Sequence, residues 1–409
     1  MSILRLQAAI ALRNIFRQPR RSALTVLAIS FSVFCVIVFQ ALKVGMHWTM
    51  VDSALSLDLG TMQIHRAGYE TNITQFQALP EPDRLLQTLE KLGIDAASPR
   101  IKAPALILAG QRSSSVLLSG IRPEQEQRIT LIGRRLTAGE YLPAGRDSLL
   151  ISQGLADSLK LRVGDTVSLM LQDVFGKPVV KKIAISGLYE TGLSSFDRHH
   201  LYLPLLTLQN FLAAEEGEMT EIALAVDPAD ARRLTRLLRE HADPGTYQVT
   251  SWQELAPDIV QLMELNDATF KLLVVIIFCI AAMGVANTMN SAIFERFREF
   301  GTIAAIGTTP AEMVMMVSLE SLILGIFSCA AGTGAAMFVC ILLGYHGVDL
   351  TSLTSANQYF TAGAVLRPEV LAGDVVTANL LTLFTALVAG LYPAVKASRL
   401  NPVDALNYT

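Results

Sequence analysis

The sequence predicts a membrane α-helical protein with four transmembrane helices and a large extracytoplasmic α/β (α+β) domain made of two nested subdomains. Of its 409 residues, 51% are hydrophobic and 17% are charged, whereas soluble domains carry about 25% charged residues. Four apolar runs are long enough to cross the roughly 30 Å of bilayer hydrocarbon as helices. A long polar stretch separates the first run from the second, and in it short strand-like segments alternate with turn residues.

Residues 1–22 precede the first apolar run and have an amphipathic pattern. One face of a helix here would carry Leu4, Ala8, Ala11, Leu12 and Ile15, and the opposite face Gln7, Arg13, Asn14, Arg17 and Gln18. A helix with one apolar and one basic face suits the interface of the inner leaflet. An amphipathic helix in the cytosol explains the same pattern, so both interpretations stay open.

The transmembrane spans are predicted from apolar runs of at least about 20 residues. The first run exceeds the roughly 7 to 15 apolar residues of a secretory signal, and no small-residue cleavage site follows it, so we interpret it as a retained anchor. The third run contains one acid, Glu320, for which a functional and an interfacial position are both open. The predicted spans are residues 23–46, 269–293, 313–343 and 375–396.

The distribution of basic residues predicts the orientation. Arg5, Arg13, Arg17, Arg20 and Arg21 precede the first span, whereas only Lys43 follows it closely. Loops rich in Lys and Arg stay in the cytoplasm. We therefore expect both termini, the loop 294–312 and the tail 397–409 in the cytoplasm, and residues 47–268 and the loop 344–374 outside.

Residues 47–268 predict the mixed α/β domain, because turn residues separate short alternating runs. Strands are expected at 61–66, 104–110, 116–119 and 247–250, helices at 81–92 and 229–241, and a turn at 122–124. The run SLLISQGLADSLKLRVGDTVSLML predicts a strand, a short helix, a turn at Gly164 and Asp165, and a second strand. Residues 177–187 would pair with that second strand as a hairpin.

We expect this domain to consist of two nested subdomains, with an inserted piece at about residues 129–211. From Pro257 the pattern is helical and continues without further Gly or Pro into the second span. The acids Asp258, Glu264 and Asp267 must lie outside the bilayer, because a charged side chain at its centre costs at least about 2.5 kcal/mol. This helix should therefore project from the membrane as a stalk.

The sequence contains no motif for catalysis. It has no G-x-x-x-x-G-K-[ST], H-E-x-x-H or G-x-S-x-G segment. The cysteines lie in apolar runs without the spacing of metal ligands. The 33 basic and 36 acidic residues give a formal charge of −3, which provides no positive field for nucleic acid. We expect a non-catalytic protein without a metal site, a directly bound cofactor or a nucleic-acid partner.

The loop between the second and third spans has the features of a docking element. It combines charged Glu295, Arg296, Arg298 and Glu299 with apolar Phe297, Phe300, Ile303 and Ile306, and Gly301 and Gly307 interrupt it. Thr309, Pro310 and Glu312 then form a capping box that begins the next helix. A short two-faced element at the membrane surface suits a groove in a cytosolic partner, although a simple interfacial turn is the alternative.

Three segments resemble the signatures of the FtsX-like/MacB-type ABC transporter permeases. They are LRNIFRQPRRSALTVLAIS, FERFREFGTIAAIGTTPAEMV and AGLYPAVKASRLNPVDALN. The order of one span, a large outside domain and three spans is similar over the whole chain. ISQGLADSLKLRVGDTVSL and FDRHHLYLPLLTLQNFL resemble the inserted subdomain of this family. SWQELAPDIVQLMELNDATFKL resembles the stalk entry of its lipoprotein-releasing branch, LolC and LolE.

This resemblance implies a permease of the bacterial inner membrane with a MacB-like core domain in the periplasm. It implies a dimer with a second permease, identical or homologous, and two copies of a separate ABC ATPase that bind ATP and Mg. The ATPase would dock on the coupling element, whose residues are Glu295, Arg296, Arg298, Glu299, Phe300, Gly301, Ile303 and Ile306.

The resemblance also implies where a substrate would enter. In the lipoprotein-releasing branch this is a cavity between the first two spans of both subunits, reached from the outer leaflet. Packing against neighbouring helices explains the matching apolar residues equally well. Those residues are Phe31, Phe34, Val38, Leu42, Met46, Met263, Phe270 and Val274.

One segment departs from the family pattern. In LolC a long hairpin hooks a periplasmic carrier, and the equivalent loop, 173–178, is too short for that role. A LolE-like partner, a carrier-independent transporter and a relative with another substrate all stay open, as does docking of a periplasmic carrier or adaptor.

The sequence therefore favours the membrane subunit of an ABC transporter. Driven by a partner ATPase, it would extract or export a lipoprotein or other amphiphile from the outer leaflet. The alternative is an FtsX-like mechanotransmitting regulator of an extracytoplasmic enzyme, without transport. A membrane-anchored hydrolase is disfavoured because no nucleophile and base motif occurs.

Overall fold

The computed structural model describes residues 11–69, 76–349 and 365–398, except residues 14, 16, 18, 242 and 244. The chain forms two compact units. The membrane unit contains the described parts of residues 1–47, 263–348 and 366–409. The sheet unit contains those of residues 48–262 and 349–365. Each unit is considered by itself below.

Long apolar helices build the membrane unit. They are α2 (Pro19–Ala54), α10 (Pro257–Glu295), α12 (Pro310–His346) and α14 (Ala372–Ser398), with the short α11 (Phe297–Ala305) between α10 and α12. Within the described part of the chain, four stretches are long and apolar enough to span a membrane: Ser22–Leu59, Pro257–Glu295, Pro310–His346 and Ala372–Lys396. The predicted four-span architecture is thereby confirmed, and α10 is the continuous helix expected from Pro257.

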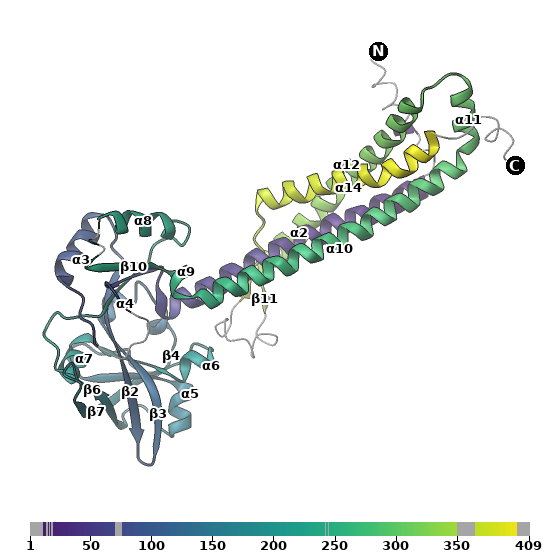
Figure 1. Cartoon of the computed structure of the whole chain (residues 1–409). Coiled ribbons are helices and arrows are strands. Elements are labelled where there is room, and N and C mark those ends of the chain that lie inside the picture. Colours follow the sequence, from purple (N-terminus) through teal and green to yellow (C-terminus); the bar gives the residue numbers. More distant parts are fainter. Residues whose placement is uncertain are drawn as a thin grey trace. The chain divides into compact units, whose positions relative to one another are not determined.

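The helices of the membrane unit contact one another at several points. Figure 1 shows α2 beside α10, where the Lys43 ammonium lies 2.9 Å from the Asp267 carboxylate. A Cβ on Gly332 of α12 would come within 2.5 Å of the Ser30 carbonyl oxygen and 2.8 Å of the Val33 Cβ. Only glycine allows α2 and α12 to approach this closely, as is common between membrane helices.

A single ten-stranded sheet forms the core of the sheet unit, in the order β10-β1-β9-β2-β3-β8-β5-β7-β4, with β6 paired to β2 and β7. The strands are β1 (Met62–Arg66), β2 (Ala97–Ala109), β3 (Arg112–Ile121), β4 (Leu136–Gly139), β5 (Ser148–Ser152), β6 (Thr166–Gln172), β7 (Pro178–Tyr189), β8 (His200–Pro204), β9 (Glu221–Leu224) and β10 (Tyr247–Ser251). Strands from the predicted insert occupy one end of this sheet. The parallel pair β3–β8 and the antiparallel pair β2–β6 join them to the other strands.

Shorter helices flank the sheet. They are the π-helical η1 (Leu55–Leu59), α3 (Pro82–Lys91), α4 (Pro123–Glu126), the 3-10 turn η2 (Ile132–Arg134), α5 (Gln153–Leu159), α6 (Ser194–Asp197), α7 (Leu205–Leu212), α8 (Ala231–His241) and α9 (Trp252–Leu255). Two further short strands, β11 (Val348–Asp349) and β12 (Val365–Leu366), pair with each other. These elements and the sheet confirm the predicted α/β class.

The local predictions differ from the structure mainly around β2. Strand, helix, turn and strand at residues 148–172 are confirmed, and so is the hairpin partner β7. However, β2 begins at Ala97, whereas the sequence predicted a strand only from residue 104. The first half of β2 was missed because it carries the charged residues Arg100 and Lys102, although the structure buries both side chains. The expected turn at 122–124 is wrong, since α4 begins at Pro123. The helix α7 and strand β9 were not predicted.

Candidate functional site

The predicted coupling element of the membrane unit includes the helix α11, which lies between two long helices. The helix α10 ends at Glu295, and α11 follows after one residue. Gly307, with φ of +102°, then reverses the chain in a backbone region that favours glycine. Thr309 begins α12 with the predicted capping box, since its hydroxyl accepts from the Glu312 backbone N–H and the Glu312 carboxylate accepts from the Thr309 backbone N–H.

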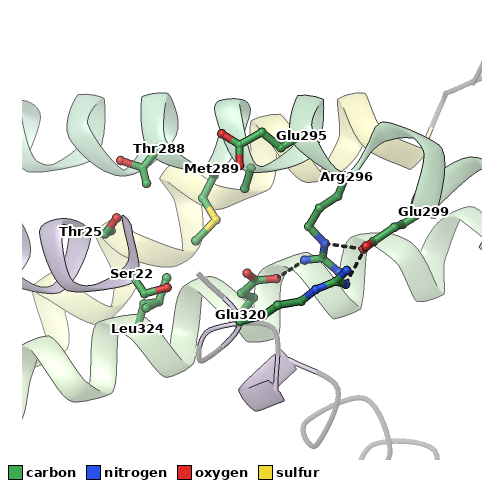
Figure 2. A pocket seen from close by; sticks show the side chains of 11 residues that line it. Ser22, Thr25, Thr288, Met289, Glu295, Arg296, Glu299, Glu320 and Leu324 are labelled. Atoms are coloured by element: carbon green, nitrogen blue, oxygen red, sulfur yellow. Dashed lines mark hydrogen bonds and ion pairs between the residues drawn. The ribbon is translucent and has the colours of Figure 1, made fainter. Parts of the chain in front are cut away.

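A chain of ion pairs connects α11 to other parts of the membrane unit (Figure 2). The Arg296 guanidinium donates to Glu299 at 3.0 Å and to Glu320 of α12 at 3.3 Å. The Arg17 guanidinium donates to Glu299 at 2.7 Å. Glu299 therefore joins the segment before α2 to α11, and Arg296 joins α11 to α12. This places Glu320 in an ion pair, which stabilises a carboxylate within an apolar helix.

The electrostatics of this chain keep Glu299 ionised. Burial raises the pKa of its carboxyl group, but the hydrogen bonds and charges of Arg296 and Arg17 outweigh burial, so the pKa lies below its usual value. The Arg296 guanidinium also lies 5.3 Å from the centre of the Phe300 ring, within the range of a cation–π contact.

These ion pairs border a polar cavity of about 220 Å³. Figure 2 shows its walls, to which α2 contributes Ser22 and Thr25, α10 contributes Thr288, and α12 contributes Glu320. Its bordering acids are Glu295, Glu299 and Glu320 and its cations Arg17 and Arg296. Arg17 and Arg296 pair with Glu299 and Glu320. The charges around the cavity therefore connect helices to one another and do not form an open charged site.

The predicted coupling residues divide into an internal and an exposed group. Phe300 is 2% exposed and packs with Ile293, Met313, Met316, Val317 and Ala394. Gly301 is also buried, and Ile303 is half-buried. Glu295, Arg298 and Ile306 are exposed, Ile306 at 82%. The expected single apolar face is therefore wrong in part, because Phe300 packs inside the chain while Ile306 faces away from it.

The predicted substrate positions lie on α2 and α10, and several pack between helices. Val38 is buried in a cluster with residues of α10, α12 and α14, and Phe34, Leu42 and Val274 pack against it. Phe31 is 66% exposed, whereas Met46, Met263 and Phe270 are half-buried. The cavity beside Arg296 contains none of these residues. Their role as a lining between two permease subunits stays a prediction.

A second charge cluster, in the sheet unit, was missed by sequence reasoning. Arg100 donates to the Glu126 carboxylate at 2.9 and 2.7 Å and to Glu221 at 3.3 Å, and it also bonds the Asp58 carbonyl oxygen. Lys102 donates to the Asp58 carboxylate at 2.7 Å. The side chains of Arg100, Glu126 and Glu221 are at most 1% exposed. Charged residues within a strand usually indicate exposure, so no sequence signal reveals this cluster.

Both cations of the cluster are paired with carboxylates. Burial lowers the pKa of Arg100 and Lys102, but their carboxylate partners outweigh burial and raise both pKa values above their usual ranges. Ser98 and Thr130 also donate to Glu126, at 2.8 and 3.0 Å. This arrangement fixes α4 and the π-helical η1 against β2.

The β6–β7 hairpin ends in the short loop that the sequence predicts. Its turn comprises residues 173–177, where the Asp173 carboxylate accepts from the backbone N–H groups of Phe175 and Lys177. Phe175 at the tip is 82% exposed. Among the described residues, no group of three or more His, Cys, Asp or Glu side chains could hold a metal ion.

Comparisons with known proteins identify the family of this chain. The family model described as MacB-like periplasmic core domain matches residues 22–240, more than half of the sequence. The family model described as FtsX-like permease C-terminal matches residues 271–402. The first match covers most of α2 and the sheet unit as far as residue 240, and the second covers most of α10 and the helices that follow it.

Individual proteins agree with these matches. The lipoprotein-releasing system transmembrane protein LolC of Xylella fastidiosa (strain 9a5c) is 24% identical over 328 residues, which cover 77% of this chain and 78% of LolC. LolC of Neisseria meningitidis serogroup B is 25% identical over 338 residues, 78% of this chain and 80% of that protein. The crystal structure of the periplasmic region of MacB from Actinobacillus actinomycetemcomitans is similar with a TM-score of 0.35 and 16% identity, covering 52% of this chain and 95% of that one.

The helices, the sheet unit and both family matches lead to one conclusion. The chain belongs to the FtsX-like/MacB-type ABC transporter permeases of the LolC and MacB kind, and is an inner-membrane protein with a MacB-like periplasmic domain.

Proposed function

We propose that this chain couples ATP binding and hydrolysis by a separate ABC ATPase to the extraction or export of a lipoprotein or other amphiphile from the outer leaflet of the inner membrane. The names of the LolC relatives support the substrate class. The chain has no catalytic activity of its own, and ATP and Mg bind to the partner ATPase. The observation that carries the proposal is that ion pairs of Arg296 and Glu299 connect α11 to α12 and to the segment before α2.

The coupling element has two different surfaces. Arg298, Thr302 and Ile306 are exposed and would contact the ATPase. Phe300 anchors the opposite side in the helix core. If the ATPase displaces α11, the pair Arg296–Glu320 would transmit the displacement to α12, and the pair Arg17–Glu299 would transmit it to the segment before α2. A docking helix fastened in this way transmits displacement, whereas a free loop would absorb it.

The orientation follows from the same proposal. The ATPase is cytosolic, so α11 and both termini lie in the cytoplasm and the sheet unit lies in the periplasm, as the basic residues favour. A second permease, identical or homologous, and two ATPase copies complete the assembly. The apolar positions led by Phe31 and Phe34 would line the substrate cavity between the two permeases. Cysteines introduced at Arg298 and Lys160 should react with a membrane-impermeant thiol reagent from opposite sides.

The ATPase contact can be tested with exposed residues of α11. The full chain, affinity-purified from native membranes, should bring down an ABC ATPase. The double variant Arg298→Glu, Ile306→Asp should lower the recovered ATPase at least tenfold while the melting temperature stays unchanged. The matched control Arg20→Glu reverses another exposed cation and should leave recovery unchanged. Equal recovery with the double variant would contradict the proposed docking surface.

A transport assay separates transport from regulation. The purified complex in proteoliposomes should release a bound lipidated protein or amphiphile when ATP is added, and non-hydrolysable ATP should not support repeated release. An ATPase that is stimulated by this permease but releases nothing would instead support the FtsX-like regulatory role.

A further inference from the structure

The sheet unit contains a large cleft that the proposed function does not use. Its volume is about 920 Å³, within the range of ligand sites. Five chain segments line it: the start of α3 at Asp83, the region of α4 at 121–127, the loop 141–145, the start of α7 at 204–209, and the loop 216–217. It therefore lies where the predicted insert meets the rest of the sheet unit.

The walls of this cleft are fixed by interactions behind them. The charge cluster holds α4 in place, because Glu126, the last residue of α4, receives two bonds from Arg100. On the other side the Gln209 side-chain amide donates to the Glu218 carbonyl oxygen at 2.7 Å, which fixes the loop that carries Glu216. The cleft is thus a preformed site.

The floor of the cleft is apolar and its rim is acidic. Ile121, Leu142 and Leu205 are at most 5% exposed, and Leu206 is 55% exposed at the wall. The charged residues of the lining are Asp83, Arg122, Glu124 and Glu216, three acids against one base. In the described part of the chain, none of these four side chains forms an ion pair or a hydrogen bond, unlike the charges beside Arg296.

Two further polar atoms of the lining lack partners among the described residues. These are the Gln125 Oε1 and the Tyr141 hydroxyl, both shielded from water. A buried polar group without a hydrogen bond costs about 1 to 3 kcal/mol. Both atoms lie within the wall of the cleft, so they do not themselves contact a ligand on its surface.

From these observations we infer that the cleft binds an extended basic peptide segment of an extracytoplasmic partner protein, in which apolar and basic residues alternate. Successive side chains of an extended segment point in opposite directions. One set can therefore enter the apolar floor while the other meets Asp83, Glu124 and Glu216. The acidic excess selects basic over acidic segments. This inference goes beyond the proposed function and does not depend on transport.

The test uses the full chain in nanodiscs of zwitterionic phosphatidylcholine, with empty nanodiscs as the blank. The probe is a fluorescein-labelled pentapeptide in which leucine alternates with lysine, and binding is followed by fluorescence anisotropy. We expect at least tenfold weaker binding of the same peptide with glutamate in place of lysine, and of one with glycine in place of leucine. Raising the salt concentration should weaken binding of the lysine peptide.

Variants of the rim test the location. Glu124→Lys with Glu216→Lys should weaken binding of the lysine peptide at least tenfold, and should strengthen binding of the glutamate peptide. The control Glu90→Lys reverses an exposed acid of α3 outside the cleft and should change neither. Both rim residues are exposed, so the fold should persist, and an unchanged melting temperature checks this.

Three results would overturn the inference. The first is equal binding of the lysine and glutamate peptides. The second is binding that the rim variants leave unchanged. The third is full displacement of the peptide by benzyltrimethylammonium at the same concentration as by unlabelled peptide, which would assign the cleft to a small organic cation. None of these results bears on ATPase recovery or on release from proteoliposomes, so they leave the proposed function intact.

Discussion

The two charge clusters of this chain differ in their exposure to water. In the sheet unit, Arg100 and its two glutamate partners are at most 1% exposed. In the membrane unit, Arg296 and Glu320 are each 13% exposed, and Arg17 is 69% exposed. The buried cluster holds α4 in the wall of the cleft, since its members cannot exchange their partners for water. The partly exposed cluster can exchange them, which suits the proposed role of α11 as a helix that responds to another protein.

Burial also sets the energetic consequence of breaking each cluster. Removing one partner from a buried pair leaves an uncompensated charge, which costs about 3 to 5 kcal/mol. An exposed pair contributes at most about 1 kcal/mol, because water and salt screen it. Substitutions in the two clusters should therefore form a graded series, from the centre of the buried cluster to the most exposed pair of the membrane unit.

The largest effect is expected for Arg100→Met in the sheet unit. Glu126 would remain buried without its cation and Glu221 would keep only Lys102, so the variant should lose about 3 to 5 kcal/mol of stability. Thermal unfolding monitored by near-UV circular dichroism measures this loss. The control Arg128→Met removes an exposed cation nearby and should change stability by less than about 0.5 kcal/mol. Equal melting temperatures for the two variants would contradict the structural role of the cluster.

Features set by neighbouring residues could be predicted from the sequence, whereas contacts between distant residues could not. Apolar runs identify helices that must face lipid, and the capping box at Thr309 acts within four residues, so both are readable locally. The pair Arg17–Glu299 joins residues 282 positions apart. Arg100 lies in the first half of β2, which was not predicted as a strand because charged residues interrupt its apolar pattern. Partners brought together by tertiary folding leave no periodic signal. The sequence therefore predicted a two-faced element between the second and third spans, but not the ion pairs that connect it to other helices.

A smaller loss is expected for Arg296→Met in the membrane unit. This variant removes the contacts with both Glu299 and Glu320, but partial exposure lets water solvate the two acids. We expect a loss of about 2 to 3 kcal/mol, the range for hydrogen bonds to charged groups. Unfolding in detergent measures it, and Arg298→Met, an exposed neighbour, is the matched control. A loss as large as that of Arg100→Met would remove the proposed distinction between the clusters.

The pH dependence of Glu299 sharpens the comparison further. Its pKa is lowered in the folded chain, so its ion pairs stabilise the fold above the pKa of the unfolded chain, and this contribution disappears as the pH falls through the folded value. Glu299→Gln should therefore cost about 1 kcal/mol at pH 7. At a pH well below the folded pKa of Glu299, the variant and the natural chain should have equal stability. A difference that grows on acidification would contradict this assignment.

The smallest effect is expected for Arg17→Gln, because Arg17 is the most exposed member of the membrane-unit cluster. The loss should be below about 1 kcal/mol. It should vanish in 1 M NaCl, where the Debye length is about 3 Å. Arg20→Gln, an exposed neighbour, is the control and should show no loss at either salt concentration. The loss caused by Arg100→Met should persist in 1 M NaCl, because ions cannot enter the buried cluster. If salt instead abolished both losses, the two clusters would not differ in their accessibility to ions. The proposed difference in role between the Arg100 cluster and the Arg296 cluster would then have no support.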